Sequence, residues 1–113
     1  MSTPVEAVLR SHLQAAREGV DAVMRDYTED SVLVTHEATY RGLAEIRKFF
    51  ATLLGGLPAG FFDAFKIRRQ EVAGEMAYIL WEAKPWISLA TDTFVVRNGK
   101  FLSQTYTPYT APD

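Results

Sequence analysis

Asp92 and His12 are the two titratable residues whose sequence surroundings direct them toward apolar side chains. Asp92 lies in a segment with the composition of a β-strand, and its neighbours on the same strand face are Ala90, Phe94 and Val96. His12 falls within a helical stripe formed by Val5, Val8, Leu9, Leu13 and Ala16. Burial raises the pKa of a carboxyl group, and an imidazole exchanges protons near neutral pH. The pair predicts acid–base chemistry; the alternative is that both are hydrogen-bonded core residues without a catalytic role.

The composition excludes several other classes of site. The 113 residues contain no cysteine, so disulfides, thiolate nucleophiles and cysteine-ligated metal centres are impossible. The two histidines have no metal-ligand spacing, and we expect neither a metal nor another cofactor. With 12 Lys and Arg against 14 Asp and Glu, the chain offers no basic surface for nucleic acid. No stretch has the ~20 apolar residues that cross a bilayer, and no leader pattern is present, so we expect no membrane association and a cytoplasmic location.

The first half of the chain is predicted to be mainly helical. Thr3 and Glu6 form a capping box around Pro4, which favours a helix start there. The predicted elements are a helix from Pro4 to Gly19, a short helix over residues 20–27, a strand over 31–36, an extended return over 39–41 and a helix from Leu43 to the glycines at 55 and 56.

The second half is predicted to be strand-rich, after a loop over residues 55–60. The candidate strands run from Phe61 to Val72, from Glu75 to Lys84, from Trp86 to Arg97 and from Lys100 to Tyr109. Short turns join them, of which Asn98-Gly99 is the most specific, and this predicts an antiparallel meander. Helices followed by such a sheet favour one α+β domain over residues 1–113, with the helices covering one face of a curved sheet.

Three stretches carry a family resemblance: DYTEDSVLV at 26–34, YRGLAEIRKFF at 40–50 and ATDTFVVRNGKF at 90–101. In these the chain resembles the nuclear transport factor 2-like superfamily, most closely its SnoaL-like and ketosteroid isomerase-like branch. The resemblance implies a cone-like (cystatin-like) fold, in which N-terminal helices pack on a strongly curved antiparallel sheet around a deep pocket. It also implies a homodimer formed through the outer sheet face, where Trp81 and Ile79 are expected to supply apolar surface.

The resemblance also implies roles for particular residues. His12 and Asp92 match the oxyanion-binding Tyr and Asp of ketosteroid isomerase, and Thr35 matches its general-base Asp. A hydroxyl without an activating partner cannot abstract a proton near neutral pH, so the usual steroid isomerisation is disfavoured. We expect Asp92 to donate a hydrogen bond or a proton, with His12 as its partner and Tyr106 as an orienting hydroxyl.

The strand around residue 80 has two faces, of which only one can line the pocket. Tyr78, Leu80 and Glu82 share one face, and Ala77, Ile79, Trp81 and Ala83 share the other. The resemblance favours the first set, which would place the carboxylate of Glu82 beside that of Asp92 and separate their pKa values. Glu82 or His36 could then supply the missing base. The alternative is that Glu82 is solvated at the mouth of the cone.

The predicted ligand is a hydrophobic small molecule, because aromatic residues dominate the expected pocket. The predicted ligand contacts are Tyr27, Thr35, Phe50, Tyr78, Glu82, Phe94 and Gln104. The function implied is acid–base chemistry, by isomerisation, dehydration or cyclisation, on a hydrophobic carbonyl compound. Because one fold hosts many activities, two alternatives stay open: a noncatalytic ligand-binding or dimerisation module, and a scaffold with a filled cavity.

Overall fold

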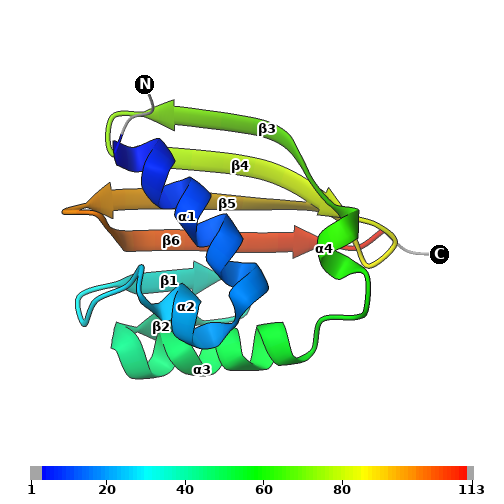
Figure 1. Cartoon of the computed structure of the whole chain (residues 1–113), viewed down its shortest axis with the longest axis horizontal. Coiled ribbons are helices and arrows are strands. Elements are labelled where there is room, and N and C mark those ends of the chain that lie inside the picture. The colour runs from blue at the N-terminus through cyan, green and yellow to red at the C-terminus, as the bar shows by residue number, and fades with distance from the viewer. Residues whose placement is uncertain (1–3, 112–113) are drawn as a thin grey trace.

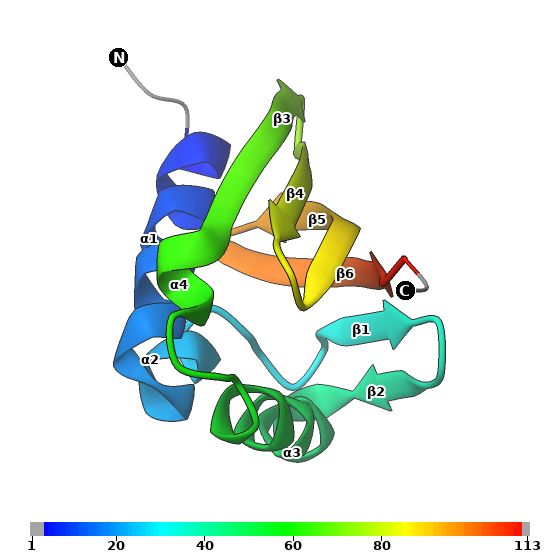
Figure 2. The ribbon, with the colours of Figure 1, turned by 90° about the vertical axis from the view of Figure 1, so that its right-hand side faces the viewer.

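The computed structural model describes residues 4–111, in which helices pack on one side of a bent six-stranded sheet (Figures 1 and 2). The elements in chain order are α1 (Pro4–Glu18), α2 (Val20–Met24), β1 (Val32–Thr35), β2 (Thr39–Arg41), α3 (Gly42–Gly55), α4 (Phe61–Ala64), β3 (Phe65–Ala73), β4 (Met76–Ala83), β5 (Ile87–Arg97) and β6 (Lys100–Tyr109). This is the α+β arrangement predicted from the sequence.

The sheet has the strand order β2-β1-β6-β5-β4-β3. The predicted antiparallel meander is confirmed for β3 to β6, whereas β1 pairs with β6 in parallel, so the sheet as a whole is mixed. Figure 2 shows the sheet bending along this order, with α1 crossing its inner side and α3 standing beside β1 and β2. No helix within residues 4–111 is long and apolar enough to span a membrane.

Helix α1 carries one apolar stripe into the core and ends where its sequence predicts. Val5, Leu9, His12 and Ala15 are its buried residues. Gly19, which follows the last helical residue, has a φ of 116°, a conformation that side chains rarely adopt. The predicted N-cap, Thr3, lies outside the described residues. His12 therefore enters the core from the middle of α1.

The expected strand from Phe61 to Val72 begins four residues later than predicted. Residues Phe61–Ala64 form the short helix α4 instead. Gly60 adopts a left-handed conformation with φ 84°, and its carbonyl accepts a hydrogen bond from the Ala64 amide at 3.1 Å, which closes a helical turn. This turn brings aromatic side chains of α4 over the inner face of the sheet.

The face of β4 that lines the interior is the opposite of the one favoured by the resemblance. Ile79 pairs with Asp92 and Trp81 with Ala90 across β4 and β5, and directly opposed residues share a sheet face. Ile79 and Trp81 are 1% and 7% exposed, so they cannot supply the outer dimer surface expected of them. Tyr78 and Glu82 consequently point to the outer face, which corrects both as predicted pocket residues.

Candidate functional site

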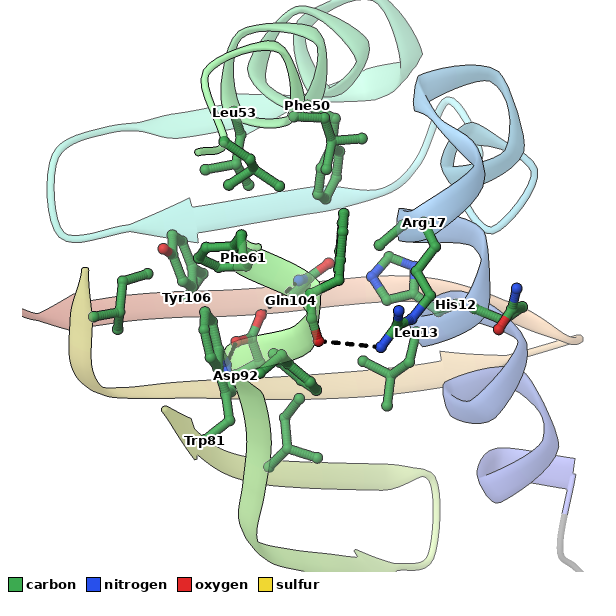
Figure 3. Close-up of a pocket in the computed structure, with 18 of the residues that line it drawn as sticks. His12, Leu13, Arg17, Phe50, Leu53, Phe61, Trp81, Asp92, Gln104 and Tyr106 are labelled. Carbon is green, nitrogen blue, oxygen red and sulfur yellow. Dashed lines mark hydrogen bonds between the residues drawn. The ribbon is translucent and has the colours of Figure 1, made fainter. Parts of the chain in front are cut away.

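A cavity of about 310 Å³ lies between the inner sheet face and helices α1, α3 and α4 (Figure 3). This volume is at the lower end of the roughly 300–1,000 Å³ typical of ligand sites. Its apolar lining consists of Leu13, Ala16, Phe49, Phe50, Leu53, Leu54, Leu57, Phe61, Phe62, Phe65, Ile79, Trp81, Ile87 and Phe94. Its polar lining consists of Arg10, His12, Gln14, Arg17, Asp92, Gln104 and Tyr106. The pocket is thus predominantly apolar, with a minority of polar side chains in its lining.

Asp92 projects from β5 into this pocket and accepts a hydrogen bond at each carboxyl oxygen. The indole Nε1 of Trp81 donates to Oδ1 at 2.8 Å, and the amide Nε2 of Gln104 donates to Oδ2 at 2.9 Å. Asp92 is only 7% exposed, as the alternation of its strand predicted. Hydrogen bonds from two N–H donors stabilise the ionised form of the Asp92 carboxyl group.

Gln104 is itself held in one orientation by a third residue. The hydroxyl of Tyr27 donates to Oε1 of Gln104, so the amide nitrogen must face Asp92. Gln104 is 4% exposed, and within residues 4–111 its side chain bonds only to Tyr27 and Asp92. The chain from Tyr27 through Gln104 to Asp92 fixes the direction in which the carboxylate faces the pocket.

The environment of Asp92 raises its pKa from 3.8 to about 6. Burial is the largest cause, because it disfavours the charged form. The hydrogen bonds from Trp81 and Gln104, and then the charge of His12, act in the opposite direction and keep the pKa from rising further. Asp92 is therefore mainly ionised at pH 7 but can accept a proton at little cost.

Tyr106 lies beside Asp92 on β6, since the two residues are direct cross-strand partners. Its ring stacks on Trp81 with centroids 6.2 Å apart and planes inclined by 7°. Burial, and secondly the charge of Asp92, raise the pKa of Tyr106 to about 12. Its phenol keeps its proton at neutral pH and makes no hydrogen bond to another described residue, so it can donate one to a ligand.

His12 lines the same pocket as Asp92, but its hydrogen-bond partner is a different carboxylate. Its Nδ1 lies 3.0 Å from Oδ2 of Asp26, a residue at the end of the α2 turn. A carboxylate at Nδ1 holds the proton there in the neutral ring and leaves Nε2 as the acceptor nitrogen. The rings of Tyr27, Phe50, Phe94 and Phe101 pack edge-on around the imidazole within 6.1 Å.

Six of the predicted site residues meet at this pocket, and four do not. The structure brings together Asp92, His12, Tyr106, Phe50, Phe94 and Gln104. Four others lie elsewhere: Tyr27 is buried behind Gln104, Thr35 bonds to the 35–38 turn, Tyr78 lies under Arg69, and Glu82 pairs with Arg68 on the outer face.

Thr35 and Glu82 depart from their predicted roles for clear physical reasons. The Thr35 hydroxyl accepts hydrogen bonds from the Glu37 and Ala38 amides, both at 3.1 Å, and so stabilises the turn between β1 and β2. The Glu82 carboxylate accepts a bond from Arg68 at 2.8 Å, across strands β3 and β4. Neither residue supplies a base to the pocket.

Sequence reasoning missed Trp81 and Asp26 as parts of the site. Trp81 was predicted on the outer face, but its indole N–H is buried and donates to Asp92. Asp26 lies 14 residues from His12, and no local spacing predicts their contact. Within residues 4–111, no group of three or more histidine and carboxylate side chains is placed to hold a metal ion.

Comparison with known proteins gives similarity in structure but not in sequence. Neither a protein-family model nor a curated protein matches the chain. An NTF2-like protein of unknown function from Burkholderia xenovorans LB400 superposes with a TM-score of 0.75 at 20% identity, over 97% of this chain and 86% of that one. A SnoaL-like protein of unknown function from Burkholderia thailandensis E264 superposes at 0.75 and 12% identity, over 96% and 98%.

A third structure adds a bound small molecule. A protein with a ketosteroid isomerase-like fold from Catenulispora acidiphila DSM 44928, in complex with trimethylamine, superposes with a TM-score of 0.65 at 16% identity, over 91% of this chain and 85% of that one. At such identities the shared feature is the backbone architecture. The helices and bent sheet of this chain form the NTF2-like fold that its sequence resemblance implies.

Proposed function

We propose that this chain is an acid–base enzyme acting on a hydrophobic carbonyl compound, by isomerisation, dehydration or cyclisation, with Asp92 as its general base. The observation that carries the proposal is the Asp92 carboxylate, 7% exposed, held by two N–H donors at the floor of an apolar pocket. A buried carboxylate with a pKa near the working pH is suited to proton transfer.

The geometry favours a base over the acid that the resemblance implies for Asp92. Both oxygens accept hydrogen bonds, so the ionised form is the one that Trp81 and Gln104 stabilise. In the proposed reaction Asp92 takes a proton from a carbon next to the carbonyl group. Tyr106, which keeps its own proton, donates a hydrogen bond to the developing enolate oxygen.

His12 supplies a second position for proton transfer in this proposal. With Nδ1 held by Asp26, its Nε2 is the nitrogen left for a ligand. Isomerisation needs the proton returned at another carbon, and dehydration needs a proton for the leaving hydroxyl group. A carboxylate base and an imidazole on different walls of one pocket can divide these tasks.

The test is turnover of a panel of enones, hydroxy ketones and epoxides by the wild type and three variants. Asp92→Asn and His12→Ala are expected to lower turnover strongly, Asp92→Asn by about 10²–10⁴-fold. Glu82→Gln, which removes a carboxylate on the outer face, is the matched control and should retain full activity. Unchanged turnover in Asp92→Asn would refute Asp92 as the base.

A noncatalytic ligand-binding module is the second candidate, and one observation favours it. Thr35 stands where the resemblance expects the base, but it lies at the end of β1 and does not line the pocket, while both oxygens of Asp92 already accept hydrogen bonds. In that case the same panel would bind saturably and no product would form.

We also propose a homodimer, as the resemblance implies, but through residues other than Ile79 and Trp81. The helices in Figure 2 lie on the inner side of the sheet. Large apolar side chains on its outer side are exposed. These include Met76, Leu89 and Tyr109, which are 43%, 38% and 58% exposed. A second copy of the chain packed there would cover this apolar surface.

A further inference from the structure

Two arginines border the pocket on the same face of α1. Arg10, Leu13, Gln14 and Arg17 are spaced at i, i+3, i+4 and i+7, so they lie along one side of the helix, and all four line the cavity. His12 enters the core from another side of the same helix. The pocket thus combines an apolar body, a carboxylate on the sheet and two guanidinium groups on α1.

Arg17 is held across the mouth of the pocket by weak contacts only. Its Nη2 donates to the backbone carbonyl of Phe62 at 3.3 Å, and its guanidinium carbon lies 5.2 Å from the centre of the Phe62 ring (Figure 3). A guanidinium has five N–H donors, and a neutral carbonyl is a poorer acceptor than a carboxylate. Most of the donor capacity of Arg17 is therefore available to a ligand.

Five other arginines of the described chain form ion pairs with carboxylates. Arg25, Arg47, Arg68, Arg69 and Arg97 each pair with a Glu or Asp within 4.0 Å. Over residues 4–111, no Asp or Glu side chain lies within 4.0 Å of the guanidinium of Arg10 or Arg17. Arg41, at the end of β2, is a third arginine among residues 4–111 without a carboxylate within 4.0 Å, but of these three only Arg10 and Arg17 line the pocket.

The charges around the mouth set the orientation of an anionic ligand. Arg17 also lines an open groove that continues from the pocket past α4, and Glu18 and Asp63 lie on that groove. Glu18 is paired with Arg25 at 3.7 Å, and Asp63 is exposed on α4. At the floor, the negative charge of Asp92 repels another carboxylate. An anionic group therefore fits at the arginine end, and an uncharged carbonyl group at the Asp92 end.

From this arrangement we infer that the ligand is an amphipathic carboxylic acid, whose apolar ring system fills the pocket and whose carboxylate binds Arg17, with Arg10 as a supporting charge. The inference rests on the proposed function, because it takes the pocket as the ligand site. It adds a chemical class: a hydrophobic carbonyl compound that carries a carboxylate at the end remote from the reacting carbonyl.

The experiment compares 1-naphthaleneacetate with its neutral analogue 1-naphthaleneacetamide by titration calorimetry at low ionic strength. The wild type should bind the acid about tenfold more tightly than the amide, the size of one charge-assisted hydrogen bond. Arg17→Gln should remove this preference while leaving the amide affinity unchanged. Arg17→Lys should retain part of it, and Arg97→Gln, which removes an arginine remote from the pocket, should retain all of it.

Three results would overturn the inference. Equal affinity for acid and amide in the wild type would remove the carboxylate preference and leave the pocket as the ligand site of the proposed function. If Arg17→Gln lowered the affinity for both probes equally, Arg17 would act only as a structural contact between α1 and α4, through its hydrogen bond to Phe62. Binding of neither probe would overturn the inference together with the proposed use of this pocket for aromatic ligands.

Discussion

Gln104 donates a hydrogen bond from its amide nitrogen to Oδ2 of Asp92 at 2.9 Å, across the neighbouring strands β5 and β6. The amide cannot rotate freely, because its oxygen accepts the hydroxyl proton of Tyr27. This relationship makes Gln104 a positioning residue for the proposed base. It also opposes the effect of burial on the pKa of Asp92.

Replacing Gln104 by leucine should shift the pKa of Asp92 further upward. The change removes a donor that stabilises the carboxylate and leaves burial less opposed. It should also destabilise the fold by about 1–3 kcal/mol, because the buried Tyr27 hydroxyl loses its acceptor. The acidic limb of the activity profile, or a carboxyl titration by NMR, measures the shift. Gln70→Leu on the exposed part of β3 is the control, and an equal shift there would contradict the assignment.

Replacing Trp81 by phenylalanine tests the second donor to Asp92. The aromatic body stays in the pocket wall, but the indole N–H that bonds Oδ1 at 2.8 Å is lost. We expect a loss of about 1.5–3 kcal/mol in the free energy of unfolding at pH 7, as for other hydrogen bonds to charged groups. Trp86→Phe, at the 38% exposed tryptophan, should lower the free energy of unfolding much less. Urea unfolding distinguishes the two, and similar losses would argue against a buried N–H to carboxylate bond.

Replacing Asp92 by asparagine should change how stability depends on pH. The folded-state pKa of about 6 is raised above the ordinary 3.8, so Asp92 favours the folded state below pH 4, and this contribution is lost as the pH rises through 6. The wild type should therefore lose roughly 3 kcal/mol relative to the variant between pH 4 and pH 8. Chemical unfolding at several pH values measures the difference. The free energy of unfolding of the exposed Asp63→Asn variant should depend on pH as that of the wild type does. A stability difference between Asp92→Asn and the wild type that does not change with pH would contradict burial of the charge.

Removing the partner of His12 should destabilise the pocket wall. Asp26→Ala leaves the buried Nδ1 of His12 without its acceptor and should cost about 1–3 kcal/mol. Asp26→Asn keeps an oxygen acceptor at the same position and should cost less. Thermal or urea unfolding at pH 7 provides the comparison; equal costs in the two variants would mean that the contact contributes little.

The proposed homodimer predicts a single species of twice the chain mass at micromolar concentration in sedimentation equilibrium. Leu89→Lys, on the exposed side of β5, should convert it to a monomer, because a lysine there would bury an unpaired charge. Tyr40→Phe, at β2, changes only a hydroxyl group and serves as the control. A wild type that sediments as a monomer would contradict the proposal.

The sequence predicted the elements well where composition and periodicity agree. The helical stripe of α1 and the Asn98-Gly99 turn place His12 and the β5–β6 hairpin correctly. Asp92 was assigned to the inner face because its strand alternates apolar residues with threonines, so only one face fits a core. The predicted start of β3 was four residues too early, because a four-residue helix such as α4 leaves almost no periodic pattern.

The face of β4 could not be settled from sequence in the same way. Tyr78 and Leu80 are as suited to a core as Ile79 and Trp81, so the alternation of this strand carries little information. The register with β5, which shifts between Trp81 and Ala83, decides the matter through long-range pairing. The contact of His12 with Asp26 depends likewise on how α1 packs against the α2 turn.

The most direct test of the account is the titration of the Asp92 carboxyl carbon by NMR, with Asp92→Asn to identify its resonance. A buried carboxylate held by Trp81 and Gln104 in an apolar pocket predicts a pKa of about 6, with a further change when 1-naphthaleneacetamide is added. A pKa near the ordinary 3.8, unaffected by the added compound, would show a solvated carboxylate and contradict the proposed general base.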